Sequence, residues 1–263
     1  MRLGRESSHN SYPSIIIGFV VLFLLYHLPE FFQRHYNQPL LWLLELGMLI
    51  FVIVAYYIGL RQKGIGLQAF GLKDFGFYKR NLFVGLSAGI LLATLSIYIT
   101  TSVGWNKLVI DGSFGHIAVT TVIFILGTSL PSLAEDILIR GYLFAHWPKN
   151  GNKIYLVIFS AVLFSLNHIY RLNRPDVMLY IFLLGLITMT CLVATNTLWL
   201  TFGIHWGTNI GYQFFNNVLS VQTIKETGYD NYILALCYLI GLLGIGLILK
   251  TNLVKTLQIK NGF

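Results

Sequence analysis

Apolar runs about as long as a lipid bilayer is thick recur along almost the whole sequence. A membrane-spanning helix needs about 20 mostly apolar residues. Of the 263 residues, 56% are hydrophobic and only 11% are charged, and the mean hydropathy is +0.69. Because a water-soluble domain carries about 25% charged residues, that class of protein is excluded. The sequence predicts an integral membrane protein with an all-α fold, a polytopic transmembrane bundle of about eight helices.

Eight segments approach the length of a spanning helix. They cover residues 14–33, 40–60, 81–101, 116–147, 153–170, 176–196, 198–219 and 231–250. The sequence shows no internal repeat and no low-complexity tract, so we expect a single membrane domain over residues 1–263. Pro29 and Glu30 follow the first apolar run, where small residues would mark a cleavage site, so no cleaved signal peptide is expected.

Positive charges are distributed unequally between the connections on the two sides of these segments. One side collects twelve, at Arg2, Arg5, Arg61, Lys63, Lys73, Lys79, Arg80, Lys149, Lys153, Lys250, Lys255 and Lys260. The other side has five, at Arg34, Lys107, Arg171, Arg174 and Lys225. Because cytoplasmic loops carry the excess of Lys and Arg, both termini are predicted in the cytoplasm. This distribution explains the net charge of +8 by topology, so no nucleic-acid partner is expected.

The connection between the second and third segments, residues 61–80, mixes basic residues with leucine and phenylalanine. Such a composition suits a strap lying in the membrane interface. An ordinary basic cytoplasmic loop explains the same composition, and both interpretations stay open.

Several other polar and thiol groups receive no catalytic role. Glu45, in the middle of the second segment, is interpreted as a structural partner for a neighbouring helix, with a functional acid as the alternative. Cys191 and Cys237 lie in apolar runs and are interpreted as small core residues. Four histidines are placed near helix ends with no ligand spacing between them: His27, His35, His116 and His146.

The stretch PSLAEDILIRGYLF, residues 131–144, places three charged residues inside an apolar segment. Pro131 is expected to kink or divide this segment, which is too long for one ordinary crossing. Asp136 and Arg140 are four residues apart with the acid first, the favoured order for an ion pair within a helix. Glu135 points away from Arg140 and has no local partner, and a lone carboxylate inside a membrane indicates a functional site.

Two later segments add polar groups with helical spacing. FSLNH places Phe164 and His168 on one face of the fifth segment, and HWGTN places His205 and Asn209 on one face of the seventh. At a rise of about 1.5 Å per residue, Glu135, His168 and Asn209 come to similar depths. Each residue alone is typical of a structural hydrogen bond between helices. Together, a carboxylate, two imidazoles and an amide indicate water activation and oxyanion stabilisation.

EDILIRG, FSLNH and HWGTN, in this order, resemble the three motifs of the CAAX prenyl protease and bacteriocin-processing (CPBP/Abi) family of intramembrane glutamic endopeptidases. The resemblance covers about residues 116–219. It implies that Glu135 is the general base and that His168 positions the water. It places His205 and Asn209 on the oxyanion side. Asp136 and Arg140 take the positions of the second acid and the arginine, although the family usually has a second Glu where this chain has Asp136.

The resemblance implies hydrolysis of a peptide bond in a membrane-associated substrate, either prenylated or carrying a leader peptide. It implies no cofactor, a location in the plasma (inner) membrane of a prokaryote, and lipids and a peptide or protein substrate as partners. One carboxylate and two imidazoles also form a zinc site, but no HExxH pair occurs in the sequence. A non-catalytic immunity or binding protein with the same polar cavity is a further alternative. A transporter is a weaker one, because the sequence shows no repeated halves. The oligomeric state is not indicated.

Overall fold

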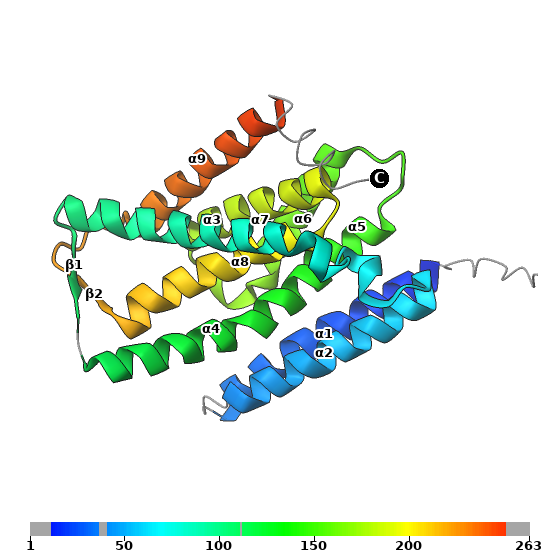
Figure 1. The fold of residues 1–263 in the computed structure, drawn as a ribbon, viewed down its shortest axis with the longest axis horizontal. Helices are drawn as coiled ribbons and strands as arrows, with labels where there is room; N and C mark the ends of the chain where they lie inside the picture. The colour runs from blue at the N-terminus through cyan, green and yellow to red at the C-terminus, as the bar shows by residue number, and fades with distance from the viewer. Residues whose placement is uncertain (1–11, 37–40, 111, 251–263) are drawn as a thin grey trace, which may run out of the picture.

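The computed structural model describes residues 12–36, 41–110 and 112–250, and it is dominated by α-helices (Figure 1). The expected helical bundle is confirmed, with eight helical passes within these ranges when α4, a π-helical turn and α5 are taken as one rod. The elements are α1 Tyr12–Tyr36, α2 Leu41–Lys63, α3 Phe75–Ser102, α4 Phe114–Asp136, α5 Tyr142–His146, α6 Lys153–Asn167, α7 Pro175–Thr195, α8 Leu198–Gln213 and α9 Asp230–Lys250.

Six of these passes are long and apolar enough to span a membrane, which makes the chain an integral membrane protein. The two that fall short are α6, with 15 residues, and α8, with 16 residues. The fifth segment was expected to run to residue 170, but α6 ends at Asn167. α8 is extended by a π-helical turn at Phe214–Val218.

Two short strands depart from the expected all-α architecture. β1, Asn106–Val109, pairs antiparallel with β2, Ser220–Thr223, and Asn106 lies opposite Thr223. β1 follows α3 and β2 follows α8, so the pairing joins two connections at one end of the bundle (Figure 1). This strand pairing was not predicted from the sequence.

Helices α3 and α8 lie side by side (Figure 1), and glycines of both helices line their contact. A Cβ atom added at Gly89 would lie 2.2 Å from the Ile204 carbonyl oxygen, and one at Gly207 would lie 2.3 Å from the Leu86 carbonyl oxygen. Small residues at four-residue spacing let helix backbones approach in this way in membrane proteins. Because Gly207 faces α3, His205 on the same helix is turned toward α4.

The connection between α2 and α3 is partly buried in the protein. Its short 3-10 helix, Gly66–Phe70, places the fully buried Phe70 ring 5.5 Å from the Tyr142 ring. The Leu198 amide donates a hydrogen bond of 2.8 Å to the Gly71 carbonyl oxygen at the start of α8. Phe75, in contrast, is exposed. Part of this connection belongs to the buried core of the protein. Neither an interfacial strap nor a plain loop therefore describes all of it.

Candidate active site

Helix α4 presents its two acids just before a change in helical geometry. The α-helix runs through Pro131 to Asp136, and a π-helical turn follows at Ile137–Gly141. Pro131 therefore does not divide the segment, which corrects that part of the expectation. Single π-helical turns within α-helices often mark functional sites. Here the turn carries Arg140.

The ion pair expected from the sequence is present. Arg140 Nη1 donates a hydrogen bond to Asp136 Oδ1, and both side chains are fully buried. The guanidinium carbon of Arg140 also lies 4.1 Å from the centroid of the Phe164 ring, a cation–π contact. Asp136 and Phe164 thus both contact Arg140 inside the bundle.

Glu135 lies next to this group but has different neighbours. Asn167 Nδ2 donates a hydrogen bond of 2.7 Å to Glu135 Oε1, and the Tyr26 hydroxyl makes a further side-chain hydrogen bond with the same carboxylate. His168 Nδ1 lies 3.9 Å from Oε1, and His205 Nε2 lies 3.7 Å from Oε2. The expected convergence of Glu135 with both histidines is therefore observed.

Both histidines are oriented through Nδ1. His205 Nδ1 lies 3.1 Å from Asp136 Oδ1, and His168 Nδ1 lies 2.8 Å from the Phe164 carbonyl oxygen. His168 stands just beyond the end of α6, where its side chain occupies a last-turn carbonyl that the helix leaves free. Because each Nδ1 faces an acceptor, each neutral ring keeps its lone pair on Nε2.

Phe164 explains why an aromatic residue belongs in the FSLNH motif. Its ring centroid lies 5.0 Å from the His168 ring and 5.5 Å from the His205 ring, and both pairs meet edge to face. The same ring contacts the Arg140 guanidinium. One buried aromatic side chain therefore fixes three polar groups of the site.

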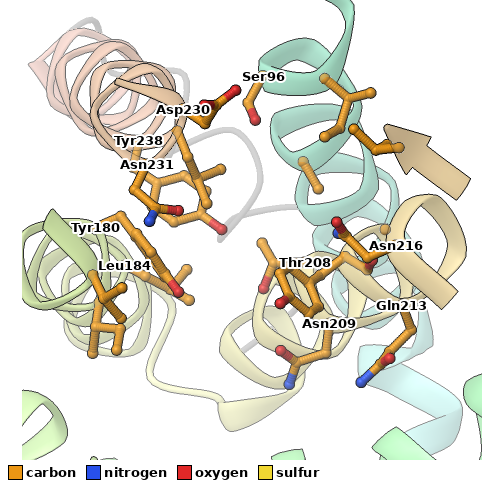
Figure 2. A pocket seen from close by; sticks show the side chains of 18 of the residues that line it. Ser96, Tyr180, Leu184, Thr208, Asn209, Gln213, Asn216, Asp230, Asn231 and Tyr238 are labelled. Atoms are coloured by element: carbon orange, nitrogen blue, oxygen red, sulfur yellow. The ribbon is translucent and has the colours of Figure 1, made fainter. Parts of the chain in front are cut away.

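Asn209 lies on α8, one helical turn beyond His205. Its Nδ2 donates a hydrogen bond of 2.9 Å to Ser132 Oγ on α4, and Ser132 Oγ in turn donates one of 2.7 Å to the Thr128 carbonyl oxygen. A primary amide has two N–H groups, so one remains for another acceptor. Figure 2 shows Asn209 beside Thr208 and Gln213, which line the same cavity.

A cavity of about 480 Å³ leads to the site. Its inner wall includes Phe164, His168, His205 and Asn209. Farther out, α3, α7, α8 and α9 surround it with hydroxyl, amide and aromatic side chains (Figure 2). This volume is within the range of ligand-binding pockets.

Sequence analysis missed three contributors that lie around Glu135 and Asn209: Tyr26, Asn167 and Ser132. It also placed His27 near a helix end and gave it no role, whereas His27 lies about two and a half turns from the end of α1. His27 Nε2 lies 2.9 Å from Asn167 Oδ1, so α1 is linked to the carboxylate through that amide. The only sequence signal was that Asn167 directly precedes His168 in an apolar segment.

Glu45 is not part of this group. It faces α4 at Gly127, where an added Cβ atom would lie 3.8 Å from Glu45 Oε1. Gly127 precedes Glu135 by about 12 Å along the helix. The structural interpretation of Glu45 as a partner of a neighbouring helix fits this position.

Among the described residues, no three His, Cys, Asp or Glu side chains are arranged to hold a metal ion. Glu135 Oε1 accepts a hydrogen bond from Asn167, and the Nδ1 atoms of His168 and His205 face the Phe164 carbonyl oxygen and Asp136 Oδ1. The geometry of the side chains therefore gives the zinc alternative no support.

Comparison with known proteins places these groups in a family. No curated protein matches the sequence. Residues 116–211 match the family described as type II CAAX prenyl endopeptidase Rce1-like, a range that ends slightly before the expected residue 219 and contains all three motifs. This part of the chain is an Rce1-like domain of the CAAX prenyl protease (CPBP/Abi) family.

Proposed function

We propose that the protein is an intramembrane endopeptidase in which Glu135 activates water. The observation that carries this proposal is the placement of the Glu135 carboxylate between two imidazoles, at 3.9 Å from His168 and 3.7 Å from His205. Both separations are too long for direct hydrogen bonds. The first one ends at His168 Nδ1, which already faces the Phe164 carbonyl oxygen, so a water shared with His168 would be held through Nε2 of the same ring. A general base must lie within reach of the proton it takes, directly or through one water.

The proposed reaction uses the side chains of this chain alone. A water held by Glu135 and by the free Nε2 of His168 adds through its oxygen to the carbonyl carbon of the peptide, while its proton passes to Glu135. The carbonyl oxygen becomes an oxyanion. When the C–N bond breaks, Glu135 returns the proton to the leaving nitrogen, so the products are a carboxylic acid and an amine.

The oxyanion would be stabilised from the α8 side. Asn209 is oriented by Ser132 and keeps one N–H group for the oxyanion. His205 donates from Nε2 only when it is protonated. Its Nδ1 lies 3.1 Å from Asp136 Oδ1, an atom that also accepts a hydrogen bond from Arg140. The amide is therefore the donor that does not depend on protonation.

One observation favours the non-catalytic alternative. Glu135 is only 4% exposed and lies behind the histidines, which themselves line the cavity. A binding or immunity protein would use the polar cavity and keep Glu135 as a buried structural acceptor. The substrate, the prokaryotic plasma membrane and cytoplasmic termini likewise stay predictions.

Replacing Glu135 by Gln separates the two functions. The amide is nearly isosteric and removes the base, so cleavage of a membrane-bound reporter should fall by about 10²- to 10⁴-fold. Glu45→Gln is the matched control, because it makes the same change on α2 away from the histidines, and it should leave cleavage unchanged. If the parent protein binds the reporter peptide, shows no cleavage, and loses no affinity on Glu135→Gln, the binding function replaces the protease.

A further inference from the structure

The cavity has a closed inner end and an open outer end. Phe164 and His205 are buried at the inner end. Arg171, Asn216 and Thr223 also line the cavity and are exposed, which places the mouth near β2 and the connection that follows α6. A substrate must enter from this end of the bundle.

Hydrogen bonds tie three connections together at the mouth. β1 pairs with β2, which joins the α3–α4 and α8–α9 connections. Asn106 Nδ2 donates a hydrogen bond to Asp230 Oδ1 at the start of α9, and Asn231 Nδ2 donates one of 2.7 Å to Asp176 Oδ2 at the start of α7. The mouth therefore lies at the end where α3, α6 and α8 finish.

The opposite end of the bundle is held together in the same way and is far more basic. Trp199 Nε1 donates a hydrogen bond of 2.8 Å to the Lys73 carbonyl oxygen, which joins the α2–α3 connection to the start of α8. Eight Lys and Arg residues within the described ranges lie at this end: Arg61, Lys63, Lys73, Lys79, Arg80, Lys149, Lys153 and Lys250.

At the mouth end, acids accompany the positive charges. Five basic residues lie there, namely Arg34, Lys107, Arg171, Arg174 and Lys225. Four acidic residues lie there too, namely Glu30, Asp176, Glu226 and Asp230. Because an excess of Lys and Arg marks the cytoplasmic side, the mouth end is the extracytoplasmic one.

We infer that the cavity takes its substrate from the extracytoplasmic side of the membrane. This inference rests on the proposed function and selects among its possible substrates. The substrate class is a peptide segment that has already crossed the membrane, such as the leader of an exported peptide or a remnant segment left in the bilayer. A prenylated chain end held in the cytoplasm lies at the wrong side of the bundle.

The chemistry of the wall suits such a peptide. On one side, α7 and α9 offer apolar and aromatic contacts from Ile181, Leu184 and Tyr238. On the other, α8 offers the amides of Gln213 and Asn216 (Figure 2). An extended backbone needs hydrogen-bond partners along one edge, while its apolar side chains need a dry surface. The cavity supplies both.

Thiol labelling of intact cells tests the sidedness directly. Cys191 and Cys237 are both buried, so the parent protein provides the unlabelled baseline. Thr223→Cys at the mouth should react with a membrane-impermeant maleimide in intact cells. Asn150→Cys, exposed at the basic end, should react only after the membrane is permeabilised. The reverse pattern would overturn the inference and leave the Glu135 chemistry untouched.

A second experiment tests the same inference by blocking the mouth of the cavity. A bulky impermeant maleimide on Thr223→Cys should abolish most of the cleavage that the same variant shows before labelling. Val103→Cys is the control, because it is exposed at the same end and outside the cavity wall, and its labelling should leave cleavage unchanged. Full cleavage by labelled Thr223→Cys would also overturn the inference. The Glu135→Gln comparison, measured without labelling, tests the proposed function separately.

Discussion

Glu135 and Asp136 are neighbours in sequence, yet the two sides of α4 on which they lie are built differently. Asp136 faces a charge and a ring, since Arg140 and His205 share its Oδ1 atom. Glu135 has hydrogen bonds with the amide of Asn167 and the hydroxyl of Tyr26, and its carboxylate lies 3.9 Å from His168 and 3.7 Å from His205. Of the two carboxylates, only that of Asp136 forms an ion pair with Arg140. The difference supports the roles proposed above, in which Asp136 is a structural partner of Arg140 and Glu135 is the base.

The largest effect is expected on the Asp136 side. Asp136→Asn keeps an oxygen that can accept from His205 but removes the charge opposite the buried Arg140, which should destabilise the fold by about 3–5 kcal/mol. Asp136→Glu keeps the charge and should cost less than about 1.5 kcal/mol. Thermal unfolding of both variants in one detergent measures the difference. Equal unfolding temperatures would mean that the ion pair is not structural.

Asn209 lies on α8, across the site from Glu135 on α4, and tests the proposed oxyanion donor. If its free N–H group donates to the oxyanion, Asn209→Ala should lower turnover by about 10²- to 10³-fold and leave capture of the peptide nearly unchanged, because the interaction strengthens as charge develops. Cleavage and capture should be measured on the same preparation. A loss of affinity equal to the loss of turnover would instead make Asn209 a binding residue.

Within helices, the sequence was a sufficient guide. The Asp136–Arg140 pair follows from a spacing of four residues, and the positions of Glu135, His168 and His205 follow from similar depths in adjacent helices. Such spacings are set by helical geometry, which local sequence encodes.

Between distant elements, the sequence was not a sufficient guide. His27 and Asn167 meet although 140 residues separate them, and nothing in the periodicity of α1 indicates which face meets α6. The β1–β2 pair and the π-helical turn after Asp136 are equally products of tertiary packing. Pro131 was expected to kink or divide α4 because the local rule for proline is strong, but the helix continues through it.

Asn167 gives the next smaller effect on the Glu135 side. Its hydrogen bond to the carboxylate involves a charged group, and such bonds contribute about 1.5–3 kcal/mol. Asn167→Ala should therefore lower kcat by about 10- to 100-fold. KM should not change, because Asn167 contacts Glu135 from behind and does not line the cavity. A change in KM alone would show that Asn167 acts on the shape of the cavity and not on the base.

The smallest effect is expected for Tyr26, the residue of α1 whose hydroxyl contacts Glu135. Helix α1 lies outside residues 116–211. Tyr26→Phe removes one hydroxyl and keeps the ring, so it should lower kcat by about tenfold, the lower end of the range for a hydrogen bond to a charged group, about 1.5 kcal/mol. The unfolding temperature should move little. Tyr57→Phe, an exposed tyrosine on α2, is the matched control. If Tyr26→Phe leaves kcat at the value of this control, α1 serves only as packing, and the groups that set the base lie entirely on α4, α6 and α8.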